Sequence, residues 1–212
     1  MAAADPFEGA LERVEQLREL YDAPMQPAIR KDIGRIDEMC RRLIAAAPMV
    51  FVATFSEQGA CDVSPRGGPP GFVTVLDDGS LAIPDATGNR RLDTLENVVA
   101  TGRAGLIFLI PGRDTTLRVN GRACVSAQPE LLARIRPVGK PPRTAIVVEP
   151  EEAYAHCPKA FVRSKLWDPA TWPDQATLPS PAEVSVAHRR EPSWTVEQEE
   201  ERIRESLLYR LD

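Results

Sequence analysis

Residues 81–99 read Leu-Ala-Ile-Pro-Asp-Ala-Thr-Gly-Asn-Arg-Arg-Leu-Asp-Thr-Leu-Glu-Asn-Val-Val, and they join a short apolar strand to a helix through a turn. Proline, aspartate and glycine between residues 84 and 88 favour the turn. The apolar positions that follow recur at helical spacing and give the helix one apolar face: Leu92, Leu95, Val98 and Val99. Asn89 belongs to a residue type that often caps a helix N-terminus, so we expect the helix to begin there.

Two arginines, Arg90 and Arg91, follow this expected cap. The partial positive charge of a helix N-terminus usually selects acidic residues at such positions. Free backbone amides, an asparagine side chain and two guanidinium groups can together hold a phosphate. The alternative is that both arginines are solvated, with Asp93 and Glu96 partly offsetting their charge. On this stretch alone both interpretations stay open.

A second basic turn, Ser64-Pro-Arg-Gly67, precedes this stretch and continues to Gly71 as a loop rich in proline and glycine. It combines a hydroxyl, a rigid proline, a guanidinium group and a glycine that lets the backbone approach a ligand. If the strands expected at 60–64 and 80–84 are neighbours, the two basic turns can converge on one phosphate. An ordinary surface turn is the alternative interpretation.

The rest of the chain predicts short strands in hairpins, with flanking helices. We expect strands at 49–54, 60–64, 72–76, 80–83, 104–110, 117–126 and 144–149, and helices at 7–20, 33–46, 89–100, 129–135, 154–167 and 195–211. The alternation of the strand at 117–126 is broken at Gly121. Six or seven strands with one helix inserted midway indicate a mainly β fold, an antiparallel β-barrel flanked by α-helices.

We expect one domain over residues 1–212, with N-terminal helices at 7–46, the barrel at about 49–155, and C-terminal helices and an arm at 156–212. The net charge of −5 gives no general reason to expect a nucleic acid or an anionic membrane as partner. The first eight residues lack a basic region followed by an apolar run, so we expect no signal peptide.

The metal-binding and redox residue types are few. Four cysteines form no C-x-x-C pair, which suits reduced thiols in a cytoplasmic protein better than disulfides: Cys40, Cys61, Cys124 and Cys157. With only two histidines, we expect no metal site.

The order of these motifs resembles the pyridoxamine 5′-phosphate oxidase-like family of FMN-binding split barrels, and in particular its members that carry S-P-R-G and G-N-R-R turns. The motifs that carry the resemblance are D-x-S-P-R-G-x-P-P-G-F at 62–72, G-N-R-R at 88–91, an apolar strand at 104–110 and T-L-R-V-N-G at 116–121. The resemblance covers about residues 40–170 and implies an antiparallel split barrel with FMN as cofactor.

The resemblance also implies roles for residues at matching positions. It places Asn89, Arg90 and Arg91 against the FMN phosphate, Ser64 and Arg66 near the phosphate or the ring, and Pro84 and Asp85 along the flavin edge. Thr116 matches the strand that approaches the isoalloxazine ring, although Thr116 and Arg118 could instead be an ordinary exposed pair. We predict that Arg90→Ala lowers the affinity for FMN.

A further segment of the resemblance contains His156, Lys159 and Arg163, which we expect on one face of a helix. This face would close over the flavin, in the family often across a dimer interface. A cation near the N1–C2 carbonyl of the ring would stabilise the reduced, anionic flavin. A solvated basic face is the alternative.

The resemblance therefore implies a cytoplasmic, homodimeric, FMN-dependent oxidoreductase acting on an unidentified small molecule, without nucleic acid, membrane or metal, and with catalytic residues unknown. The family's oxidase closes its substrate pocket with a Trp-x-x-x-Arg-Leu-type segment, of which only Arg210-Leu211 is present here. The alternatives are a genuine pyridoxamine or pyridoxine 5′-phosphate oxidase and a non-catalytic protein that binds flavin, haem or a deazaflavin.

Overall fold

The structure is a computed structural model that describes residues 5, 7–85 and 91–209. Contacts divide the chain into two compact units, Met1–Asp32 and Ile33–Asp212. The first unit contains helices α1 (Val14–Leu20) and α2 (Gln26–Arg30), neither of which has a buried residue. The helix expected at 7–20 is therefore shorter than its apolar pattern suggested. The expectation of one domain over the whole chain stays a prediction.

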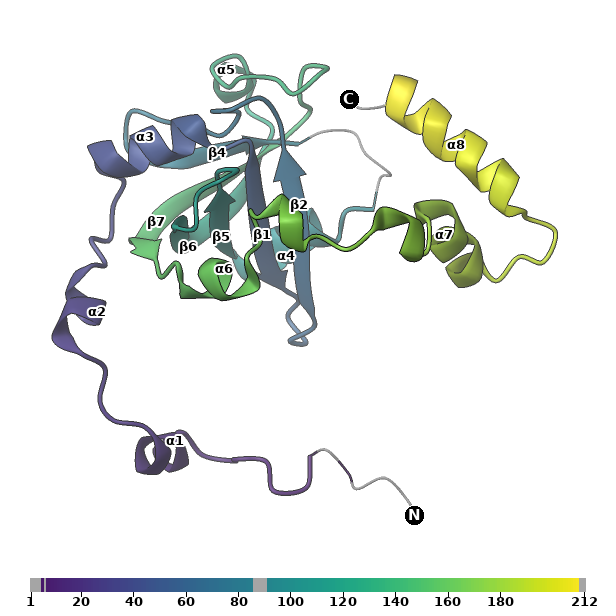
Figure 1. Ribbon diagram of the computed structural model, residues 1–212. Helices are drawn as coiled ribbons and strands as arrows, with labels where there is room; N and C mark the ends of the chain where they lie inside the picture. Colours follow the sequence, from purple (N-terminus) through teal and green to yellow (C-terminus); the bar gives the residue numbers. More distant parts are fainter. Residues whose placement is uncertain (1–4, 6, 86–90, 210–212) are drawn as a thin grey trace. The chain divides into compact units, whose positions relative to one another are not determined.

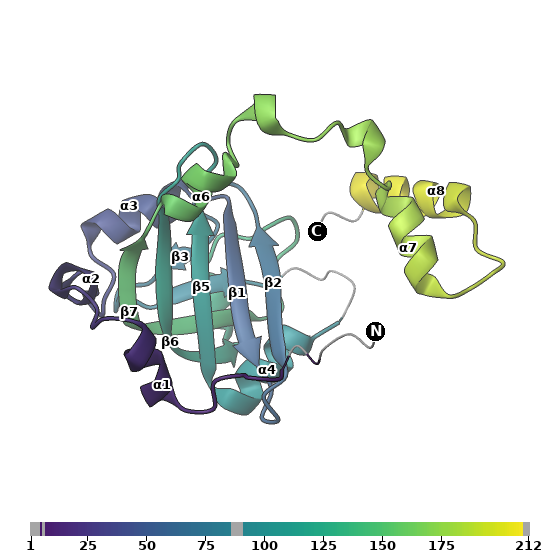
Figure 2. The same ribbon diagram turned by 60° about the horizontal axis from the view of Figure 1, so that its bottom comes forward.

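The second unit is built on one antiparallel sheet of seven strands in the order β2-β1-β5-β6-β7-β4-β3. The strands are β1 (Met49–Phe55), β2 (Cys61–Gly67), β3 (Thr74–Val75), β4 (Leu81–Pro84), β5 (Arg103–Leu109), β6 (Thr116–Ser126) and β7 (Ala145–His156). Figure 1 shows the sheet curled on itself, and Figure 2 shows β2, β1, β5, β6 and β7 side by side. This confirms the predicted antiparallel split barrel with flanking helices.

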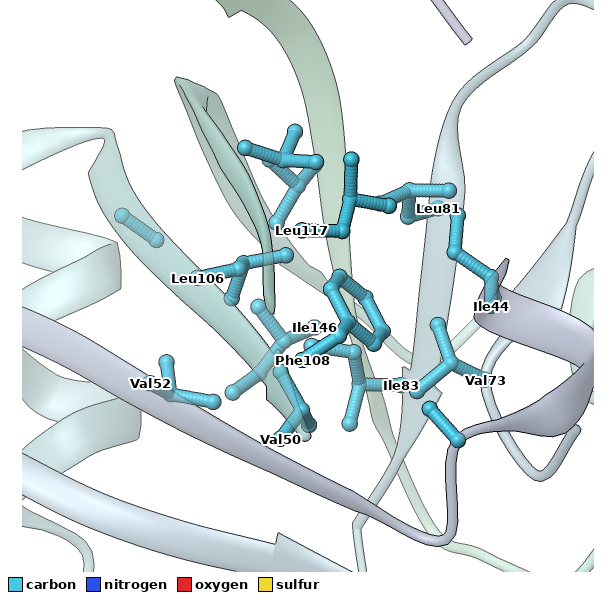
Figure 3. Close-up of a cluster of buried hydrophobic side chains, with 14 of the residues drawn as sticks. Ile44, Val50, Val52, Val73, Leu81, Ile83, Leu106, Phe108, Leu117 and Ile146 are labelled. Atoms are coloured by element: carbon cyan, nitrogen blue, oxygen red, sulfur yellow. The ribbon is translucent and has the colours of Figure 1, made fainter. Parts of the chain in front are cut away.

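Alternation along the strands explains which face of the sheet is buried. Val50 and Val52 of β1 lie opposite Phe108 and Leu106 of β5, and all four side chains are fully buried or nearly so. Figure 3 shows these side chains meeting others from α3, β4, β6 and β7 inside the curl. Because burying one such side chain stabilises the fold by about 1.5–3 kcal/mol, this inner face fixes the register of the strands.

The helices of this unit flank the sheet or follow it. They are α3 (Glu38–Ala46), α4 (Asp93–Thr101), α5 (Pro129–Leu132), α6 (Lys159–Ser164), α7 (Pro181–Arg189) and α8 (Val196–Tyr209), with short 3₁₀ turns at Pro169–Thr171 and Gln175–Thr177. Helix α4 packs against β1, β2, β5 and β6. Helices α7 and α8 pack against each other as a hairpin.

The start of α4 corrects one expectation. The helix begins at Asp93, with Leu92 as its N-cap, and not at residue 89. Asp93 and Glu96 occupy the first turn, where the helix dipole favours negative charge. Asn89 and Arg90 lie outside the described residues.

Two strands are longer than predicted. β2 continues through Ser64-Pro-Arg-Gly67, where the sequence predicts a turn, because β2 is an edge strand and tolerates a proline there. β7 continues to His156, so the helix expected at 154–167 is wrong in its first part and α6 begins only at Lys159. The break predicted at Gly121 is confirmed as a register shift between Asn120 and Gly121.

No helix in the described ranges combines the length and the apolar character needed to cross a membrane. All four cysteines are free thiols, and only Cys40 is buried. Within residues 5, 7–85 and 91–209, no three His, Cys, Asp or Glu side chains are grouped so that they could hold a metal ion.

Candidate functional site

Strand β2 directs Ser64 and Arg66 toward the same face as the barrel core. They lie directly opposite Val52 and Val50 of β1, which are fully buried, and directly opposed residues share a face of the sheet. Ser64 and Arg66 are half-buried, whereas Pro65 between them is exposed. The strand therefore presents a hydroxyl and a guanidinium group at the edge of the barrel interior.

A polar cluster around Asp62 holds α4 beside these two residues. The Asp62 carboxylate accepts hydrogen bonds from Thr94 Oγ1 of α4 at 2.6 Å and from Ser64 Oγ at 3.3 Å. Asn97, one turn along α4, donates to Thr54 Oγ1 of β1 at 3.1 Å. Thr54 and Thr94 are buried, so these bonds are made where water does not compete.

Sequence reasoning did not assign Asp62, Thr94 or Asn97. The pattern did contain a signal, because residues 62 and 64 share one face of a strand and residues 94 and 97 share one face of a helix. Asp62 and Thr94 are 32 residues apart in the sequence, so the contact between the strand face and the helix face becomes visible only in the fold.

The positive charge of Arg66 acts on the carboxyl group of Asp85. Burial raises the pKa of Asp85 above its ordinary value of 3.8, and the nearby charge of Arg66 partly opposes that rise. Asp85 follows Pro84, the buried last residue of β4, and its backbone N–H donates to the carbonyl of Thr144. Four strands separate β2 from β4 in the sheet order, so the effect of Arg66 on Asp85 acts across the curled sheet (Figure 1) and not between paired strands.

Of the three residues expected at the phosphate, only Arg91 is described. Its Nε donates to Asp93 Oδ2 at 2.5 Å, and its side chain is 74% exposed. Arg91 is thus engaged with the first turn of α4, and its contact with a phosphate stays a prediction. Asn89 and Arg90 stay predictions, since they lie outside the described residues.

A second group of predicted residues lies on the outer face of the sheet. Thr116, at the start of β6, lies directly opposite His156, the last residue of β7. The ring of Tyr154 is 6.3 Å from that of His156, and the Arg118 guanidinium carbon lies 5.9 Å from the centroid of Tyr154. Thr116 is buried, so the interpretation of Thr116 as an exposed strand residue is wrong.

Helix α6 carries the remaining two predicted residues, Lys159 and Arg163, both exposed. They do not share a helical face with His156, because His156 belongs to β7. Phe161 of α6 stacks on Trp167 at 6.1 Å, and Trp167 Nε1 donates to the Arg113 carbonyl at 3.0 Å. These contacts fix the segment after β7 against the turn between β5 and β6.

The predicted site residues therefore form two groups. Ser64 and Arg66 lie on the inner face of β2, and the charge of Arg66 acts on Asp85, whereas Thr116 and His156 lie on the outer face of the sheet with α6 after them.

Comparisons with known proteins give a family and similar chain folds. The family model for pyridoxamine 5′-phosphate oxidase matches residues 36–157. HupZ from Group A Streptococcus is 17% identical, with a TM-score of 0.44, over 57% of this chain and 93% of its own. The haem storage protein HutZ from Vibrio cholerae is 10% identical, with a TM-score of 0.40, over 57% and 94%.

A pyridoxamine 5′-phosphate oxidase-related, FMN-binding protein from Nostoc punctiforme is 17% identical, with a TM-score of 0.37, over 60% of this chain and 81% of its own. Among curated proteins the chain has no match. At such identities and scores the solved structures carry no argument about ligands.

Proposed function

Because the chain belongs to the pyridoxamine 5′-phosphate oxidase family, we propose that it is an FMN-dependent oxidoreductase acting on a small molecule. The observation that carries the proposal is that Ser64 and Arg66 face the barrel interior on the strand whose Asp62 accepts a hydrogen bond from Thr94. Thr94 lies in the first turn of α4. The convergence of the two basic turns on one phosphate stays a prediction, since only Asp85 and Arg91 of the second turn belong to the described residues.

The residues at this edge fit a phosphate ester. Arg66 offers a planar fork of N–H donors, and it is half-buried, with one of them donating to the carbonyl of Pro65 at 3.0 Å. Ser64 adds a hydroxyl group. The N-cap of α4 is Leu92, whose side chain cannot accept from the N–H groups of the first turn, and N–H groups at such a position can hold an anion.

Asp85 would contact another part of the cofactor than the phosphate. The carboxylate of Asp85 would accept a hydrogen bond from an N–H group of the flavin, in partly buried surroundings that raise its pKa. FMN, when bound, supplies two-electron transfer. The residues of this chain bind it, orient it and set the charge around it.

We further propose that the site is shared between two copies of the chain. The second group, His156 with Lys159 and Arg163, lies beyond the outer face of the sheet, so it would serve the flavin held by another copy. The positive charge of Lys159 and Arg163 would then stabilise the reduced ring. The outer face also carries exposed apolar residues, among them Phe55, Val63 and Ile107, which a second copy would cover.

The first experiment is the visible spectrum of the purified protein, followed by heat release of any chromophore, its mass, and titration with FMN. We expect FMN to be released or to bind, and we expect Arg66→Gln to weaken binding about tenfold or more, because a charge-assisted hydrogen bond is lost. The matched control is Arg113→Gln, at an exposed arginine in the β5–β6 turn, which should bind as the wild type does.

Two outcomes would contradict the proposal, and a third would extend it by identifying the substrate. A colourless protein that does not bind FMN would remove the cofactor assignment. A haem spectrum, or bound flavin that no nicotinamide cofactor reduces, would indicate a binding protein and not an oxidoreductase. Steady oxygen consumption with pyridoxamine 5′-phosphate would identify the substrate despite the divergent C-terminus.

A further inference from the structure

A cavity of about 760 Å³ lies away from the residues of the proposed cofactor site. One wall comes from residues 34–36 and Arg41 of α3, and another from the turn at residues 77–80 that leads into β4. Its floor comes from β6 and β7 beside the register shift at Gly121. This turn precedes β4, whereas Asp85 of the cofactor site follows it, so the two sites lie at opposite ends of that strand.

The register shift shapes the floor of the cavity. Gly121 lies opposite Pro150, and a Cβ atom at Gly121 would come within 1.9 Å of the Glu149 carbonyl oxygen. The two strands therefore approach more closely here than a side chain would permit. Ala123 and Val147 supply apolar surface next to this point.

The carboxylates that line the cavity already have partners. Glu149 pairs with Arg122 across the two strands at 3.3 Å, and Asp77 pairs with Arg134. Asp78 accepts a hydrogen bond from the backbone N–H of Ser80 at 2.9 Å. None of these groups is left to attract a cation strongly.

Two arginines in the cavity wall, Arg35 and Arg41, have no ion-pair partner among the described residues. In the part of the chain that the structure describes, neither guanidinium group has a carboxylate within 4.0 Å. Asp37, on which the charge of Arg35 acts, caps α3 by accepting a hydrogen bond from the Cys40 N–H at 2.8 Å. Arg41 is half-buried, and a partly desolvated cation is stabilised by an anionic partner.

We propose that this cavity binds a small organic anion whose carboxylate or phosphate group is held by Arg35 and Arg41. The apolar part of the ligand contacts Ile36, Ala123 and Val147. The volume lies in the range of small-molecule sites, and two guanidinium forks on adjacent segments suit a group with two or three oxygens. The proposal is independent of FMN binding, because it uses none of the same residues.

The test is an amide chemical-shift titration of the full chain, as purified, with phenyl phosphate and with benzoate. Both probes join an apolar ring to an anionic group, and the tighter of the two identifies whether phosphate or carboxylate is preferred. We expect saturable shifts at Gly34, Gly79 and Gly102, which line the cavity. Benzyl alcohol, which has the ring without the charge, should not produce them.

Two matched variants test whether Arg41 contributes to binding of the anion. Arg41→Gln should weaken binding about tenfold or more, because charge-assisted hydrogen bonds are lost. Arg42→Gln changes the neighbouring, exposed arginine of α3, which does not line the cavity, and should change affinity less than about twofold.

Four results would overturn the proposal: no saturable shift with either anion, equal binding of benzyl alcohol, an equal loss in Arg42→Gln, or shifts confined to Arg66 and Asp85. The last result would place the probe in the proposed cofactor site. Retention of the cavity shifts in Arg66→Gln separates the two sites, whatever the outcome for FMN.

Discussion

On the Asp85 carboxyl group, burial and a nearby cation act in opposite directions. Burial is the larger effect and raises its pKa above 3.8, while Arg66 lowers it. The folded state therefore binds the proton more tightly than the unfolded state does. The stabilisation is present below about pH 3.8 and is lost as the pH rises through the raised folded value.

Asp85→Asn removes this penalty, because the amide stays neutral at every pH. We expect a higher urea midpoint than that of the wild type at pH 7, with the difference shrinking as the pH falls toward 3.8. Glu57→Gln, at an exposed carboxylate in the β1–β2 turn, should show no such trend. A lower midpoint for Asp85→Asn at pH 7 would show that the ionised carboxylate stabilises the fold through Arg66.

Residue types at the site were predictable, whereas their partners were not. A serine and an arginine in the turn at 64–67 indicated anion binding, and the structure places both at the edge of the barrel interior. The role of Asp62 depends on Thr94 of a helix that follows two strands later, so no local pattern could reveal it. The partner of Arg91, by contrast, is close in the sequence, because Arg91 forms an ion pair with Asp93.

At the scale of elements, the register shift in β6 allows a specific prediction about Gly121. Gly121→Ala would place a Cβ atom 1.9 Å from the Glu149 carbonyl oxygen, so the paired strands must separate. We expect a loss of about 2–3 kcal/mol or more in the free energy of unfolding, measured by urea denaturation. Backbone cannot move aside as a flexible side chain can.

Gly112→Ala is the control for Gly121→Ala. Gly112 has a φ of +78°, but a Cβ atom added there would meet no other atom within 4 Å, so only backbone strain of about 1–2 kcal/mol is expected. Equal losses in the two variants would mean that β6 and β7 can relax around the added methyl group.

The hairpin of α7 and α8 depends on one buried carboxylate. Glu199 accepts hydrogen bonds from Arg202 at 2.6 and 2.8 Å, from Ser185 at 2.6 Å and from Trp194 at 3.0 Å. Arg202 first, and then Ser185, hold the pKa of Glu199 well below its ordinary value of 4.5. The resulting stabilisation is present above pH 4.5 and is lost only as the pH falls through the much lower folded value.

Glu199→Gln should therefore loosen the hairpin at neutral pH, because the arginines lose their counter-charge. We expect amide hydrogen exchange in α7 and α8 to quicken about tenfold or more at pH 7, and the gap from the wild type to narrow below pH 4.5. Glu200→Gln, at the exposed neighbouring residue, should leave exchange unchanged. A pH-independent gap would mean that shape and not charge holds the helices together.

The strands with strong apolar alternation were predictable together with their ends, whereas the ends of other elements were not. β1, β5 and β6 match the expected strands within one residue at each end because their apolar alternation is decisive. β7 extends to His156 because β6 pairs with it along its whole length, which no property of residues 150–156 reveals. Tertiary pairing overrode the local helical pattern there.

For the whole molecule, composition and strand count supported a barrel but did not give its strand order. β4 pairs with β7, more than sixty residues away, and neither composition nor strand count reveals such a pairing. The motif order supplied what periodicity could not, since a family match over residues 36–157 carries the topology with it. The proposal that two copies of the chain share the cofactor site also concerns the whole molecule.

The outer face of the sheet is where a second copy would pack. Its apolar residues alternate with the core residues of β1, β2 and β5: Met49, Phe51, Phe55, Val63, Ile107 and Leu109. Ile107 lies between Phe51 and Arg118 in the register, and it is 37% exposed. Packing two such faces about a two-fold axis would bury apolar surface from both chains and bring the outer-face group of one copy toward the other.

Ile107→Glu should prevent this association, because pairing would bury two unpartnered carboxylates against apolar surface. By light scattering after size exclusion, we expect the wild type at twice the chain mass of 23.3 kDa and the variant at that mass. Val99→Glu, at a residue of α4 that is 73% exposed, should stay dimeric. If Ile107→Glu remains a dimer that binds FMN, the interface lies elsewhere. If it is a monomer that binds FMN with unchanged affinity, the residues of one chain suffice, and the outer-face group has no part in holding the cofactor.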